Sequence, residues 1–144
     1  MTHNKTYSYT IPIFYVSIKV LVGDTMKDIL QNKIFTKEDR ELYGRDTAAL
    51  AFTQKDTIYI AVPVGKEDVQ YLVHEIVHAK NFLYKMRGMS IDINNDENEA
   101  YIVQYIYNKC EDAKRKFAKF VSKQRENEAT TQQGTGPSGP GSQI

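Results

Sequence analysis

Two histidines and a glutamate are the residues of this chain whose types and spacing suggest catalysis. His74, Glu75 and His78 occur together as H-E-x-x-H. On a helix, residues four apart lie on the same face, so the two imidazoles can bind one metal ion. Zinc accepts imidazole nitrogens and, in catalytic sites, keeps a fourth position for water. Glu75, next to the first histidine, is then placed to act as the general base on that water.

The residues around H-E-x-x-H predict the helix that this arrangement needs. Acidic residues and a possible cap precede it, and basic residues and a glycine follow it, which suits the helix dipole. These residues are Gly65, Glu67 and Asp68 before the motif and Lys85, Arg87 and Gly88 after it. Apolar residues at helical spacing predict a buried stripe of Val69, Leu72, Val73, Ile76, Leu83 and Met86. The two histidines fall roughly opposite this stripe and are therefore not expected in the core.

A third metal ligand must come from elsewhere, because the remaining histidine, His3, lies in a polar segment. The segment 94–106 begins with Asn and Asp and predicts a second helix that carries two candidate carboxylates. Glu97 shares a face with Tyr101, whose phenol could orient a ligand or stabilise an oxyanion. Glu99 lies nearer the aliphatic side of that helix, so periodicity favours it as the inward carboxylate. Either glutamate could instead simply complement the helix dipole.

These residues together resemble a known group of enzymes. H-E-I-V-H-A, followed by E-x-x-A-Y beginning at Glu97, is similar to the small zincin-type metallopeptidases of the gluzincin kind found in phages and prophages. It is more distantly similar to the protease domain of the ImmA/IrrE group. The resemblance covers about residues 11–107 and is strongest in the metal motif. It implies Zn²⁺ bound by His74, His78 and Glu97, with Glu99 as the alternative third ligand.

The resemblance also implies an α+β fold, a minimal zincin-like domain. In it a small, mostly antiparallel sheet packs on the motif helix and on a long C-terminal helix. The implied activity is hydrolysis of a peptide bond by a zinc-activated water, with Glu75 as the general base. Two alternatives remain open. One is a non-catalytic, zinc-stabilised protein-binding module, and the other is a regulatory protease specific for one partner such as a repressor or antitoxin.

Composition restricts the setting in which this chemistry would operate. The 144 residues, 41% hydrophobic and with a net charge of +1, suit one soluble domain and do not indicate nucleic-acid binding. No segment has the length and apolarity of a membrane span, and no signal peptide is expected. The lone Cys110 indicates a reducing compartment, so we expect a cytoplasmic protein acting on a peptide or protein substrate in a bacterial or phage-infected cell. The sequence leaves its oligomeric state open.

The elements that must hold the site can be read from the rest of the sequence. Strands are predicted at 11–22, 48–53 and 57–64, the last two as a hairpin. Short helices are predicted at 26–32, capped by Asp24 or Thr25, and at 36–42. Because related proteases bind substrate along a sheet edge, the strand at 58–62 is the expected edge.

Two further segments complete the prediction. A brief extended link is expected at 89–95, and a long helix at 96–123, whose basic far half is interpreted as a solvated helix end. Residues 126–144 are rich in Gly, Pro, Ser and Gln and predict a disordered tail, because such a segment buries too little apolar area to offset chain entropy. The folded domain is thus expected to span 1–125.

Overall fold

The computed structural model describes residues 3–44, 47–66 and 69–133. In chain order its elements are β1 (Asn4–Ile11), β2 (Val16–Gly23), α1 (Met26–Ile29), α2 (Lys37–Tyr43), β3 (Leu50–Gln54), β4 (Thr57–Pro63), η1 (Val64–Lys66), α3 (Val69–Met86) and α4 (Glu97–Gln133). The strands form one sheet in the order β1-β2-β4-β3. Among the strands of these described residues only β2 and β4 pair in parallel, so the predicted α+β fold with a mostly antiparallel sheet is confirmed.

The first hairpin corrects the prediction of one strand at 11–22. Its first strand, β1, begins at Asn4 in the polar segment that the sequence analysis left unassigned, and 11–22 contains the end of β1, a tight turn and most of β2. The turn places Ile13 and Tyr15 at φ values of 70° and 52°. Residues other than glycine rarely adopt that conformation, and a β-branched residue such as Ile13 does so least often. These two residue types therefore did not indicate a turn here.

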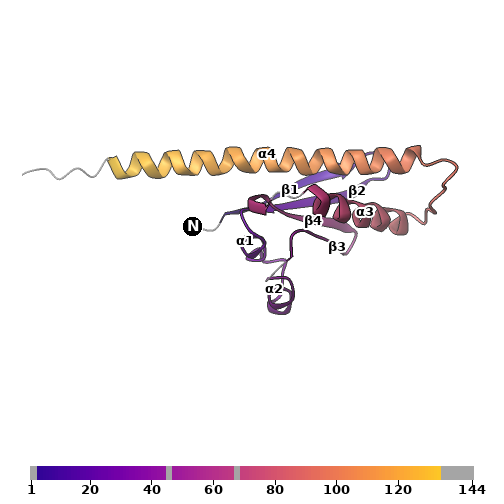
Figure 1. Cartoon of the computed structure of the whole chain (residues 1–144), viewed down its shortest axis with the longest axis horizontal. Helices are drawn as coiled ribbons and strands as arrows, with labels where there is room; N and C mark the ends of the chain where they lie inside the picture. The colour runs from indigo at the N-terminus through magenta and orange to yellow at the C-terminus, as the bar shows by residue number, and fades with distance from the viewer. Residues whose placement is uncertain (1–2, 45–46, 67–68, 134–144) are drawn as a thin grey trace, which may run out of the picture.

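The sheet has an apolar core on both faces because side chains alternate along its strands. On β2 and β4, even-numbered residues such as Val20 and Ile60 pack against α3 and α4. Odd-numbered residues such as Leu21 and Tyr59 pack on the other face with Met26, Ile29 and Phe35 from the segment around α1. Figure 1 shows α1 and α2 on the side of the sheet away from α4. Burial on both faces makes β2 and β4 rigid supports for the helices.

The predicted hairpin at 48–53 and 57–64 is confirmed as β3 and β4, with Lys55 in the turn at a φ of 55°. The expectation that 58–62 forms the free edge is wrong. β4 lies inside the sheet, paired with β2 on one side and β3 on the other. The edge strands are β1 and β3. Strand order along the chain could not reveal this, because β4 pairs in parallel with a strand far upstream.

Local capping sets where α1 and α2 begin. Thr25 caps α1 and Thr36 caps α2, and each forms a capping box with an aspartate three residues later. The sequence placed both helices correctly but made α1 too long, since it ends at Ile29. The link at 89–95 contains turns and no strand, against the expected extended segment.

The last helix, α4, runs well past the sheet (Figure 1). It ends at Gln133, so the prediction of a disordered tail from 126 is wrong for Glu126 to Gln133, while 134–144 lie outside the described residues. The polar side chains after Val121 are largely exposed, so this part of the helix is held by its backbone hydrogen bonds and not by the core. Within the described residues, none of the helices is long and apolar enough to cross a bilayer.

Candidate metal centre and general base

The helix that carries H-E-x-x-H, α3, forms where the sequence predicted it. It ends at Met86, and Gly88 follows at a φ of 62°, a conformation that glycine adopts without strain. Its buried residues are Leu72, Ile76, Ala79, Lys80, Leu83 and Tyr84. Val69 and Val73, which were predicted in the buried stripe, are exposed, Val69 by 56%. The predicted first-turn acids Glu67 and Asp68 lie outside the described residues.

The two histidines point away from the core, as predicted, and toward each other. Nε2 of His74 and Nε2 of His78 are 3.1 Å apart, and both side chains are exposed. Two nitrogens bound to one tetrahedral zinc ion at the usual bond length are separated by about 3.3 Å. The pair therefore has the spacing that a shared metal ion requires. The same distance also permits a hydrogen bond between the rings, in which one nitrogen donates and the other accepts.

The carboxylate of Glu75 lies between α3 and the free edge of the sheet. The backbone N–H of Ala51 in β3 donates to its Oε2 at 2.7 Å, and the side chain is half-buried. Since β3 is an edge strand, this N–H points away from β4 and is available to the helix. The contact holds one carboxylate oxygen of Glu75 against the backbone of β3 and leaves the other without a contact to this strand's N–H.

The proposed third ligands are not brought to the histidines. Glu99, in the first turns of α4, forms an ion pair with Lys80, which lies on the buried side of α3. Glu97 is exposed at the start of α4. Among the described residues, no group of three His, Cys, Asp or Glu side chains is close enough to hold a metal ion. The residues present thus fit two of the three protein ligands of a catalytic zinc site.

The structure does separate Glu97 from Glu99 in another way. Glu99 is the inward carboxylate, as helical periodicity favoured, and Glu97 faces solvent. Tyr101 is 65% exposed and lines a cavity together with Glu99, which the histidines do not line. Tyr101 is therefore not placed beside the imidazole pair.

Two residues of this region were missed from the sequence. Lys80 is buried. Its position four residues after Ile76, on the apolar side of α3, could have indicated this burial. Such a position requires a carboxylate partner, and Glu99 supplies it. The backbone of Ala51 carried no signal, because an N–H group at a sheet edge has no side-chain signature.

The basic far half of α4 is partly neutralised by its own acids. Asp112 accepts from Arg115 and from Lys116, and Glu111 accepts from Lys114. These pairs support the interpretation of a solvated helix end.

Comparison with known proteins adds no further assignment. No family model, curated protein or solved structure matches the chain. The resemblance to zincin-type peptidases therefore rests on the residues of the motif alone.

Proposed function

We propose that this chain is a zinc-dependent peptidase that hydrolyses peptide bonds with Glu75 as its general base. The observation that carries the proposal is the 3.1 Å approach of the His74 and His78 nitrogens on an exposed helix face. Both side chains face solvent, where a metal ion and a substrate can reach them. The buried Cys110 suits a reducing compartment, and we propose the cytoplasm.

Glu75 is the residue that handles the proton. When bound, the metal supplies a water of lowered pKa and polarises the scissile carbonyl. Oε2 of Glu75 is held by Ala51, which leaves Oε1 to take a proton from the attacking water and pass it to the leaving amine. The hydrogen bond to β3 keeps the carboxylate from rotating away.

The substrate peptide would lie along β3. The N–H of Ala51 is donated to Glu75, but in an antiparallel strand the N–H of Thr53 points to the same free edge, where a peptide could pair with it. A peptide paired with this edge passes beside Glu75, because Glu75 itself contacts the edge. The proposed substrate strand is thus β3, in place of the interior 58–62.

A catalytic zinc site needs a third protein ligand beside His74 and His78. Glu97, with Glu99 as the alternative, is proposed from the resemblance alone. Glu97 is exposed and has freedom to move, while Glu99 would have to leave Lys80. Replacing each by Gln and measuring zinc affinity distinguishes them, since loss of one ligand weakens binding by at least tenfold whereas loss of a bystander does not.

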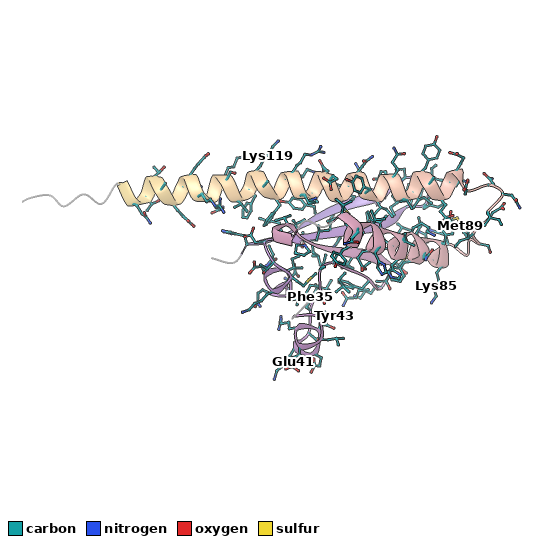
Figure 2. All side chains as sticks on the ribbon, viewed as in Figure 1. Phe35, Glu41, Tyr43, Lys85, Met89 and Lys119 are labelled. Carbon is teal, nitrogen blue, oxygen red and sulfur yellow. The ribbon has the colours of Figure 1, made fainter. Side chains whose placement is uncertain are left out.

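The central test compares Glu75→Gln with His74→Ala on protein loaded with zinc. Glutamine keeps the oxygen that accepts from Ala51 but cannot take a proton, so we expect zinc to be retained and peptide hydrolysis to fall by at least 100-fold. His74→Ala should lose both zinc and peptide hydrolysis. Zinc is measured by mass spectrometry and hydrolysis with a quenched peptide library. Glu41→Gln, at an exposed position on α2 (Figure 2), is the matched control and should keep both.

Full hydrolysis by Glu75→Gln would exclude Glu75 as the base. Failure of the unaltered protein to retain zinc at a stoichiometry near one would exclude the metal site itself.

A non-catalytic module is the second candidate. It is favoured by one observation, that the Glu75 carboxylate accepts a hydrogen bond from the backbone of Ala51, a contact that serves the fold without any chemistry. This reading predicts zinc binding with no cleavage of any peptide in the library. A regulatory protease gives the same result on generic peptides and is distinguished by cleavage of a single protein in a lysate of its host, lost in Glu75→Gln.

A further inference from the structure

One end of the molecule gathers large apolar side chains at its surface. They come from the tip of the β1–β2 hairpin, from the link at 89–95 and from the first turns of α4, and each is more than half exposed: Ile13, Tyr15, Ile91, Ile93 and Tyr101. We call these five residues the apolar end. Figure 1 shows the link at the end of the molecule opposite to the C-terminal part of α4. An exposed apolar cluster of this kind indicates an interaction surface.

A cavity of about 980 Å³ joins the parts of the apolar end. Ile13 and Tyr101 line it, and Ile11 and Ile102 form buried parts of its wall. Ile93 is 85% exposed and is not a lining residue, so it does not fill the cavity of its own chain. The surface thus offers a recess and, beside it, an apolar projection. An interface between two copies needs both, because under two-fold symmetry each copy supplies the projection and the recess.

The recess is held in shape by hydrogen bonds to the hairpin. Arg87 donates from Nε to the carbonyl of Phe14 at 2.9 Å and from Nη2 to that of Tyr15 at 3.4 Å. The Tyr105 hydroxyl donates to the carbonyl of Thr10 at 2.8 Å. The hairpin tip is therefore bound both to the end of α3 and to α4. A recess that exists before a partner arrives lowers the entropic cost of binding.

The two ends of the link carry exposed charges of opposite sign. Lys85 and Arg87 precede it, and Asp96 follows it, ahead of an acidic first turn of α4. The charges are thus arranged with opposite signs on the two sides of Ile91. A two-fold axis near this residue places the basic side of one copy opposite the acidic side of the other, at both edges of the contact. The surface is therefore complementary in charge to a second copy of itself.

The other charges near the link add little repulsion between two copies. The link itself contains one acid, Asp92, whose Oδ1 accepts the Asn94 N–H at 3.0 Å and so is turned toward its own backbone. The carboxylate of Glu99, which lines the cavity, is neutralised by Lys80. The whole chain has a net charge of only +1, so long-range repulsion between copies is weak.

We propose that two copies of this chain associate through their apolar ends about a two-fold axis near Ile91. Ile93 of each copy enters the cavity of the other, and Lys85 of each copy faces Asp96 of the other. This surface shares no residue with the histidine pair, with Glu75 or with β3. The proposal is therefore independent of the peptidase activity.

The first test measures the mass of the full chain by sedimentation equilibrium in EDTA, so that no metal ion joins the exposed histidines of two copies. We expect a monomer–dimer equilibrium with a dissociation constant of about 100 μM or lower, as for a small transient interface. Ile93→Glu places a charge in the recess and should weaken the dimer at least about tenfold. The matched control is Leu42→Glu on α2, which is 71% exposed and should leave the dimer unchanged. A chain that stays monomeric at about 1 mM, or equal effects of the two variants, would overturn the proposal.

A charge exchange tests the two-fold pairing itself. Lys85→Glu alone and Asp96→Lys alone each bring like charges together at both edges, so each should weaken the dimer about tenfold. An equimolar mixture of the two variants should regain the original affinity, because every edge of the mixed dimer again pairs opposite charges. Lys37→Glu and Glu38→Lys, both exposed on α2, are the matched controls and should have no effect. Circular dichroism checks that each variant keeps its helices. A mixture that associates no better than either variant alone would overturn the proposed pairing.

Discussion

The two sides of α3 carry polar residues under opposite conditions. On the outer side, His74 and His78 face solvent and contact each other. On the inner side, Lys80 is 4% exposed and its partner Glu99 is 24% exposed. The inner pair must remain together, because a buried ammonium without a counter-charge is strongly destabilising. The outer pair carries no such constraint, and a hydrogen bond between the rings or a shared metal ion would each account for its close approach.

This difference teaches how to separate functional from structural polar groups in one helix. A buried charged residue needs a partner of opposite charge in the fold, so its contact is explained by stability. Two exposed polar residues that point toward each other have no such need and can bind a ligand together. The inner pair should respond to mutation through stability, and the outer pair through metal binding.

The largest expected effect is on the inner side. Glu99→Ala leaves the ammonium of Lys80 buried without its partner and should reduce the free energy of unfolding by about 3 kcal/mol. Glu97→Ala, two positions earlier but exposed, should change it by less than about 0.5 kcal/mol. Urea unfolding in EDTA measures both. Similar losses for the two variants would show that the Lys80 pair does not set the docking of α4. The double variant Lys80→Met with Glu99→Leu should recover most of the loss, because it removes both charges.

Zinc should produce the next largest effect, on the outer side. A ligand at 100 times its dissociation constant stabilises a protein by about 2.7 kcal/mol, which thermal unfolding detects as a raised Tm. The increase should vanish in His74→Ala and in His78→Ala, while the Tm without zinc stays close to that of the unaltered protein because both side chains are exposed. A large drop in Tm without zinc would assign the histidines to the fold.

An exposed ion pair should contribute far less than the buried one. The hydrogen bond from Lys116, followed by that from Tyr9, lowers the pKa of Asp112 from 3.8 to about 2. A carboxylate whose pKa is lowered on folding adds stability above its unfolded pKa and loses it as the pH falls toward its folded pKa. Asp112→Asn should therefore cost under about 1 kcal/mol at pH 7, and the difference should disappear between about pH 4 and pH 2. A difference that persists at pH 2 would point to lost packing instead of lost charge.

The smallest effect is expected from the end of α4. Removing residues from 126 onward takes away side chains that the described part of the helix exposes, so the free energy of unfolding should change by less than about 0.5 kcal/mol. Circular dichroism should show a loss of helix without a change in the urea midpoint. A lowered midpoint would show that this part of the chain supports the domain.

Much of the scaffold could be predicted, because it depends on local patterns. The caps Thr25 and Thr36, the β3–β4 hairpin and the span of α3 follow from residues close in sequence. The first hairpin could not be predicted. Pro12 was a turn signal, but the turn also uses Ile13 and Tyr15 in conformations that these residue types seldom adopt, so the residues did not indicate a tight turn here.

The candidate site divides in the same way. The sequence by itself determined that His74 and His78 share a face and that Glu75 lies beside them, since a helical repeat fixes those directions. Only the tertiary structure decided that the Ala51 N–H donates to Glu75, that Lys80 forms an ion pair with Glu99, and that β3 rather than β4 is an edge strand. Each of these joins residues that are distant in the chain. Their meeting depends on the packing of whole elements, which no local pattern encodes.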